Sequence, residues 1–326
     1  MRAAALGSRA LAFSLACCAA GSSAAQTSPG DGRAWLQRIY QATQSLSYTG
    51  TFVYQHDRRS EASRVTRMAS AQGDVERLEA LEGEPRDIVR SKDGVRCYLP
   101  RARTLKVDRH GVARRFPAML PEQLTELLKH YTVRVGGPDR VAGRPCQSIA
   151  LQPKDHYRYG YELCADEATG MLLRSITLNE SDTPVEQFTF TQLEVGQVRP
   201  EAVEPQHATR SWRIEEASVR PADLGAQGWR VDTDLPGFHK IVEVVRVLGE
   251  REPVGQLVYS DGLAAVSVFI ERAAGRQDSA RRGAATVGGI NIFVREVDDH
   301  IVTVVGEAPA ASVRRIADRV RYERPQ

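Results

Sequence analysis

Apolar residues near the start of the chain recur at the spacing of an amphipathic helix. The stripe consists of Trp35, Ile39, Ala42 and Leu46. Steps of four, three and four residues place these side chains on one face, which predicts a helix over residues 31–46. From residue 48 to residue 55 the period changes to two, which is typical of a strand with one buried face.

Short strand-like runs follow, with glycines between most of them. We predict strands at 64–68, 75–81, 88–90, 95–99 and 104–107, and longer antiparallel ones between 132 and 193. A second amphipathic helix is predicted from the spacing of Leu120, Leu124, Leu127 and Leu128, and Pro121 suits its first turn. Many strands and two helices predict an α+β fold, in which a curved antiparallel sheet packs around the helices.

The alternation fails between residues 196 and 209, where Pro200, Pro205 and scattered glutamates replace it. Strand-like runs then resume at 241–247, 256–260, 264–270, 290–297 and 301–305. A closing helix is predicted from Val313, Ile316, Ala317 and Val320. We therefore expect a first domain at 26–198, a linker at 199–210 and a smaller α+β domain at 211–326.

The first 25 residues have the order of a secretory signal peptide. Arg2 and Arg9 precede or border an apolar run over 10–20, and small residues lead to a cleavage site after Ala25. A lipoprotein signal at Cys17 is the alternative. No later run approaches the length of a membrane-spanning helix, so we expect a periplasmic chain that does not cross the membrane.

Composition and charge limit the function classes. The full chain carries a formal charge of +3, and removal of residues 1–25 takes away two arginines and no acidic residue, which leaves +1. This near-balance gives no argument for a nucleic-acid partner. A hydrophobic share of 42% argues against a disordered chain.

Three cysteines remain after signal cleavage: Cys97, Cys146 and Cys164. If the hairpin around residues 153–157 pairs about Asp155, then Cys146 lies opposite Cys164, close enough for a disulfide. Two reduced, buried thiols are the alternative. Cys97 lies in a strand between Arg96 and Tyr98 without a catalytic motif, which favours a role as a small buried side chain.

Motifs for catalysis and for metal or cofactor binding are missing from the sequence. The seven histidines are scattered and do not have metal-ligand spacing. The sequence contains no Gly-x-Ser-x-Gly elbow, His-Glu-x-x-His motif, phosphate-binding loop or dinucleotide fingerprint. We therefore expect a binding protein without a cofactor, and an envelope hydrolase is the least favoured class.

A basic segment beside apolar residues suggests a ligand site in the first domain. Arg114 and Arg115 adjoin Phe116 and Leu120, and cations beside an apolar mouth would suit an amphiphile with an anionic head. The other candidate ligand-binding residues are Trp35, Phe52, Tyr54 and Leu124. Solvated hairpins whose arginines protect a sheet edge are the alternative.

Several segments occur in an order that resembles the RseB/MucB family. In the first domain they are Trp-Leu at 35–36, Tyr-x-Gly-Thr-Phe-Val-Tyr at 48–54, Glu-Arg-Leu at 76–78, Gly-Glu-Pro-Arg at 83–86, Cys-Tyr-Leu-Pro at 97–100, Asp-His-Tyr-Arg-Tyr-Gly-Tyr at 155–161 and Thr-Gly-Met-Leu-Leu at 169–173. In the second they are Leu-Pro-Gly-Phe at 235–238, Tyr-Ser-Asp-Gly-Leu at 259–263, Ser-Val-Phe-Ile-Glu at 267–271 and Val-Gly-Glu at 305–307. The resemblance covers nearly all of residues 31–320.

The resemblance implies a fold and a function. It implies a first domain similar to the lipoprotein carriers LolA and LolB, an open half-barrel over helices with an apolar cavity. It also implies that the second domain, with part of the first, binds the periplasmic segment of an RseA/MucA-like anti-sigma factor. Such binding would shield the anti-sigma factor from site-one proteolysis and restrain the sigma-E (AlgU-type) envelope-stress response until lipopolysaccharide or a lipoprotein acyl chain releases it.

The resemblance names a partner but does not say which residues of this chain contact it. The candidate anchors in the second domain are Tyr259, Val268, Phe269 and Phe293, because regulatory segments are often held by a few apolar or aromatic contacts. Strand alternation does not say which face is covered, so the same residues could be core. A periplasmic lipid or lipoprotein carrier is the alternative function, and the sequence is also compatible with a homodimer.

Overall fold

The computed structural model describes residues 31–109, 120–121, 124–248, 252–273 and 282–324. The signal segment 1–25 lies outside them. The described residues of the first part of the chain form two α-helices, α1 (Gly32–Ser45) and α2 (Leu124–His130). Its described strands are β1 (Tyr48–His56), β2 (Arg59–Met68), β3 (Val75–Ala80), β4 (Asp87–Ser91), β5 (Gly94–Leu99), β6 (Thr104–Asp108), β7 (Tyr131–Val141), β8 (Arg144–Pro153), β9 (Gly160–Asp166), β10 (Leu172–Leu178) and β11 (Pro184–Val195).

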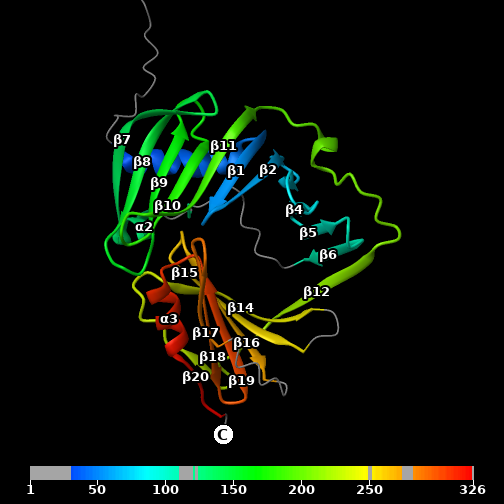
Figure 1. The fold of residues 1–326 in the computed structure, drawn as a ribbon, viewed down its shortest axis with the longest axis vertical. Helices are drawn as coiled ribbons and strands as arrows, with labels where there is room; N and C mark the ends of the chain where they lie inside the picture. Colours follow the sequence, from blue (N-terminus) through cyan, green and yellow to red (C-terminus); the bar gives the residue numbers. More distant parts are fainter. Residues whose placement is uncertain (1–30, 110–119, 122–123, 249–251, 274–281, 325–326) are drawn as a thin grey trace, which may run out of the picture.

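The second part follows a short 3-10 helix, η1 (Pro200–Val203). Its described elements are β12 (Arg213–Pro221), β13 (Trp229–Val231), β14 (His239–Leu248), β15 (Val254–Ser260), β16 (Ala265–Arg272), β17 (Gly283–Val287), β18 (Ile290–Val297), β19 (His300–Gly306), α3 (Ala310–Asp318) and β20 (Val320–Tyr322). Figure 1 shows the two parts one above the other, joined on one side through β12.

The strands of both parts form one hydrogen-bonded ladder. Its order is β7-β8-β9-β10-β11-β1-β2-β3-β4-β5-β6-β12-β14-β15-β16-β19-β18-β17, with β13 and β20 as a separate pair. We call the part of the ladder from β7 to β6 the first sheet and the part from β12 to β17 the second sheet. Neighbouring strands are antiparallel except β6 and β12, which run parallel with Thr104 beside Arg213. In the described residues the ladder does not close on itself. The predicted α+β architecture, an open curved sheet on helices followed by a smaller α+β domain, is confirmed.

Helix α1 lies across strands of the first sheet (Figure 1). The Asp31 carboxylate accepts a hydrogen bond from the Ala34 amide (3.1 Å) and so caps the helix. The helix buries Trp35, Leu36 and Ile39, the face that the periodicity predicts. None of the helices in the described residues is long and apolar enough to span a membrane.

The narrow part of the first sheet, β3–β6, is held by ion pairs and by the predicted linker. Arg77 donates to Asp87 (2.8 Å), and Arg90 donates to Glu76 (2.6 Å). The predicted linker contacts this region, since its Val203 is 4% exposed and the ring of His207 lies 6.2 Å from that of Tyr98. The segment 199–210 therefore packs on the first sheet and is not a free linker.

The second sheet is covered by α3 on one face. Its core includes Leu257, Val266, Val302, Val313 and Ile316. The predicted closing helix is too long by two residues, because α3 ends at Asp318 and Val320 begins β20, which pairs with β13.

Candidate functional site

An apolar cluster fills the space between the first sheet and its helices. We call this cluster the first-domain core; its buried members are Trp35, Leu36, Ile39, Leu120, Leu124, Leu127, Tyr131, Ile149, Leu151, Tyr159, Tyr161, Leu163, Ala165, Leu172 and Leu263. All come from the first domain except Leu263, which lies between β15 and β16. A ligand with an acyl chain would therefore have to displace side chains from this core.

A second, aromatic cluster lies on the β1–β11 side of the same sheet. The rings of Phe52 and Phe188 have centroids 5.1 Å apart, and those of Phe188 and Phe190 are 5.0 Å apart. The Tyr54 hydroxyl donates to Glu186 (2.6 Å) at the edge of this cluster. Burial raises the pKa of Glu186, and the charge of nearby Glu307 raises it further.

The structure brings only some of the candidate ligand-binding residues into one cluster. Trp35, Leu120 and Leu124 share the first-domain core. Phe52 lies in the aromatic cluster and Tyr54 packs against it. The remaining candidates, Arg114, Arg115 and Phe116, lie outside the described residues, so the proposed cationic rim rests on sequence alone.

Cys146 and Cys164 are joined by a disulfide with a Cα–Cα distance of 5.5 Å. The predicted register of their hairpin was wrong by two residues, because Ser148 pairs with Cys164 and Cys146 pairs with Asp166. This pairing is centred on His156, one residue later than predicted, and the Asp155 carboxylate accepts hydrogen bonds from the Tyr157 amide and the Arg158 guanidinium. A shift of two preserves the face on which side chains lie, so the cysteines still meet diagonally. Cys97 is a half-buried free thiol.

The four candidate partner anchors fall into two groups. Tyr259 and Val268 are 5% and 0% exposed and belong to the core under α3, so their side chains face the interior. Phe269 and Phe293 are half-buried. Phe293 packs against the α3 side with Arg314 5.5 Å from its ring centroid, whereas Phe269 follows Val268 in β16 and points to the opposite face.

The face that carries Phe269 has many apolar side chains among a few polar ones, and the three α-helices of the described residues do not cover it. Phe269 is level with Thr303 on β19 and Gln256 on β15. Other half-buried residues whose register places them on this face are Val242, Val244, Val258, Ile292, Val294, Ile301 and Val305. We call this surface the open face of the second sheet.

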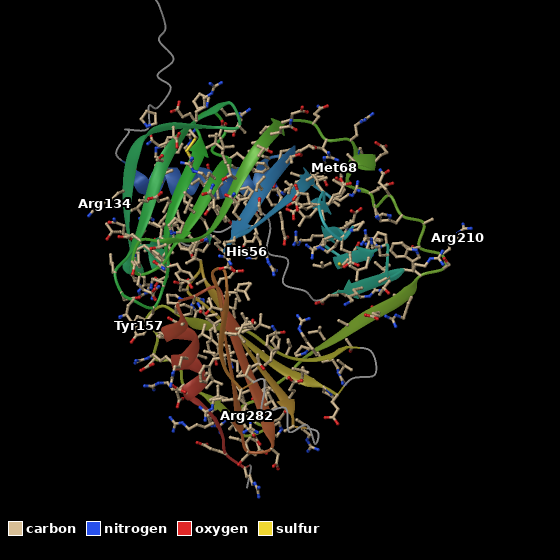
Figure 2. All side chains as sticks on the ribbon, viewed as in Figure 1. His56, Met68, Arg134, Tyr157, Arg210 and Arg282 are labelled. Carbon is tan, nitrogen blue, oxygen red and sulfur yellow. A yellow bond between two sulfur atoms is a disulfide. The ribbon has the colours of Figure 1, made fainter. Side chains whose placement is uncertain are left out.

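Two charged residues at the junction of the domains had no role assigned from sequence. Arg158 and Asp261 have fully buried side chains and form an ion pair of 2.7 Å between β8–β9 and β15–β16. Both lie within segments that carried the family resemblance. A signal was therefore present, but only the fold shows that these segments meet. Figure 2 shows the neighbouring Tyr157 at the same junction, beside α3.

The described residues contain no group of three or more histidine, cysteine, aspartate or glutamate side chains that could hold a metal ion. Their binding features are instead apolar clusters and the open face. The geometry thus offers an apolar core that an acyl chain could enter only by displacing side chains, and an uncovered sheet face that could contact a peptide.

Two family models match successive parts of the chain. The MucB/RseB N-terminal domain matches residues 31–217, and the MucB/RseB C-terminal domain matches residues 223–321.

Curated relatives match the chain along most of its length. The sigma factor AlgU regulatory protein MucB of Pseudomonas aeruginosa is 32% identical, covering 91% of this chain and 93% of the relative. The sigma-E factor regulatory protein RseB of Escherichia coli K12 is 25% identical, covering 91% and 92%. A solved complex of P. aeruginosa MucA and MucB contains a chain with 29% identity and a TM-score of 0.70, covering 90% of this chain and all of that one.

Proposed function

The chain belongs to the MucB/RseB family, and from this premise we propose that it holds the periplasmic segment of a MucA-like or RseA-like anti-sigma factor. The observation that carries the proposal is the full-length match to MucB, whose solved structures include complexes with MucA. The proposed role is a negative regulator of the sigma-E (AlgU-type) envelope-stress response. It consists of binding and requires no catalytic step.

The proposal places the protein in the periplasm. Residues 1–25 would direct export and then be removed, so the mature chain would meet the outer part of a membrane-bound anti-sigma factor. While bound, it would cover that segment and keep a site-one protease from it.

We propose a division of labour between the domains. Residues 26–198 would sense the releasing ligand, a lipopolysaccharide or a lipoprotein acyl chain, through the first-domain core. Residues 211–326 would hold the partner, with the packed segment 199–210 between them. For the partner we favour the open face around Phe269, because its half-buried valines and isoleucines offer the apolar contacts by which regulatory segments are often held.

A binding and protection experiment tests this function. Purified mature chain is mixed with the periplasmic segment of the anti-sigma factor encoded beside its sigma factor, and the mixture is separated by size and then exposed to the site-one protease. We expect co-elution and protection of the segment from cleavage. If the proteins elute separately while the chain transfers lipoprotein between membranes, the carrier function would replace the regulator.

A further inference from the structure

We propose that the turn between β15 and β16 is a plug that closes the first-domain core, and that an acyl chain enters this core only when the plug withdraws. The plug turn comprises residues 261–263. The inference rests on the proposed function for the identity of the ligand, and it deepens that function by naming the element that a ligand must displace.

Leu263 is the residue that fills the core. It is 7% exposed and belongs to the same buried cluster as Leu120, Leu124 and Tyr131 of the first domain, although it lies in the second. A Cβ on the neighbouring Gly262 would lie 3.0 Å from the Pro121 ring, so the turn sits tightly against the chain that leads to α2. Figure 1 shows the β15 end of the second domain next to α2.

Arg158 fastens the plug turn from the first domain. Its guanidinium donates to Asp261 (2.7 Å), to Asp155 (3.0 Å) and to the Pro236 carbonyl (2.5 Å). The Tyr131 and Phe238 ring centroids each lie 5.6 Å from the guanidinium carbon. Because a buried charge without its partner is strongly unfavourable, the contact favours two states, one with the pair intact and one with both charges in water.

The plug turn keeps its shape without help from the first domain. The Asp261 carboxylate accepts hydrogen bonds from the amides of Leu263 (2.9 Å) and Ala264 (2.8 Å). Ser260 accepts from the Gly262 amide (3.0 Å) and donates to the Ala264 carbonyl (2.8 Å). Gly262 has a φ of +100°, which an L side chain rarely adopts. The turn can therefore enter and leave as a preformed unit.

The core contains a polar group suited to an incoming ligand. The Tyr131 hydroxyl is buried and finds no hydrogen-bond partner within the described part of the chain. A buried hydroxyl is usually bonded, and this ring lies beside the Arg158 guanidinium that the plug holds. After withdrawal, the hydroxyl and the freed Arg158 would face the same opening, where a carboxylate or phosphate headgroup could bind both.

The remaining contacts between the domains are mainly polar. Asn291 donates to the Tyr159 hydroxyl (2.8 Å), Ser312 donates to the Tyr157 carbonyl (2.7 Å), and the Gly288 amide donates to Asp57 (3.0 Å). Water can replace such hydrogen bonds at small net cost. Leu263 and the Arg158–Asp261 pair are therefore the contacts that hold the plug turn in the first-domain core, whereas the β6–β12 pairing joins the two domains on another side.

Replacement of the leucine tests the plug in the whole mature chain. Leu263→Ser is compared with the parent and with Leu81→Ser, the same change at a side chain that is 39% exposed. The probe is 11-(dansylamino)undecanoic acid, whose fluorescence rises in an apolar site. Since the serine loses the apolar burial that holds the turn in the core, we expect Leu263→Ser to bind the probe about tenfold more tightly than the parent. Equal affinity in all three proteins would overturn the plug.

A reversible cross-link tests the same idea without weakening the core. His56→Cys and Gly288→Cys would join the end of β1 to the β17–β18 turn; Figure 2 shows His56 at this junction. A Cβ on Gly288 would lie 2.8 Å from that of His56, so the two segments must move apart by about 1 Å to reach the usual Cβ–Cβ distance of a disulfide. The background carries Cys97→Ser. We expect the oxidised protein to bind the probe at least about tenfold more weakly than the reduced one. Equal binding would contradict the plug, and the Cys97→Ser parent under the same reductant controls for the native disulfide.

The anti-sigma segment is titrated into the same proteins as a separate readout. If the parent binds no segment, the proposed function fails, while the probe comparison still decides whether residues 261–263 close the core. If the parent binds the segment but neither the leucine variant nor the cross-link changes probe affinity, the plug fails and the proposed function stands.

Discussion

Glu186 has a carboxylate in a largely buried position, where its negative charge is unfavourable. It accepts hydrogen bonds from Tyr54 (2.6 Å) and Thr177 (3.1 Å), and Gly289 of the second domain lies against it. Burial raises its pKa above the ordinary value of 4.5, Glu307 adds to the rise, and His56 opposes it. Because the folded pKa is raised, the ionised carboxylate lowers the stability of the native state at neutral pH.

The pKa shift predicts how Glu186→Gln responds to pH. At neutral pH the variant should melt at a higher temperature than the parent, because it lacks the buried charge. The advantage should shrink as pH falls through the raised pKa and vanish below 4.5, where the glutamate is protonated in both states. Thermal unfolding from neutral to acid pH measures the difference, and a difference independent of pH would show that charge is not its cause.

The disulfide between Cys146 and Cys164 closes a short loop across the β8–β9 hairpin. Cys146→Ala with Cys164→Ala should lower the free energy of unfolding by about 3 kcal/mol, because a loop of this length restricts the unfolded chain. Denaturant unfolding checks the magnitude. In the parent, alkylation without reductant followed by mass analysis should label Cys97 alone; labelling of all three cysteines in the mature chain would rule out the bridge.

At the scale of elements, the sequence predicted the helices and strands that have a clear local periodicity. It missed strands that form only because they pair with distant parts of the chain. The helix at 31–46 was predicted well because four apolar residues share one stripe. Strands β12 and β17 were not predicted, since β12 has four charged residues and few large apolar ones, and β17 is Gly-Ala-Ala-Thr-Val without a large aromatic or aliphatic run. Pairing with β6, β14 and β18 places them in the sheet.

Gly50 lies in β1, where the strand bulges beside β11. A Cβ at this position would lie 2.5 Å from the Phe190 ring and 2.9 Å from the Gln192 carbonyl oxygen. Gly50→Ala should therefore destabilise the first domain by about 1–3 kcal/mol through overpacking. Denaturant unfolding measures the loss. Gly137→Ala in β7, whose Cβ would meet nothing within 4 Å and whose φ is not positive, controls for the substitution, and equal losses would argue against a steric cause.

The two faces of the second sheet give different expectations for partner binding. Phe269→Ser should weaken the anti-sigma segment about tenfold, as expected for an aromatic anchor on the open face. Phe293→Ser, on the α3 face, should leave the affinity close to that of the parent. Calorimetric titration measures both affinities, and circular dichroism verifies folding. The reverse ranking would place the partner on the α3 face.

At the scale of the whole molecule, each domain inserts a side chain into the other. Leu263 of the second domain lies in the first-domain core, and Tyr157 of the first packs against the core of the second. Sequence alone could not locate these contacts, because strand alternation does not show which face another domain covers. The fold class could be predicted from periodicity. The partner anchors could not, and two of the four candidates, Tyr259 and Val268, are interior residues.

The central claim is that one chain holds an anti-sigma segment and releases it when its first domain takes up a lipid. The most direct measurement is the affinity of the mature chain for the periplasmic anti-sigma segment, with and without lipopolysaccharide below its aggregation limit. The account predicts a complex whose affinity falls about fivefold or more when the lipid is present. An affinity that the lipid leaves unchanged would contradict it.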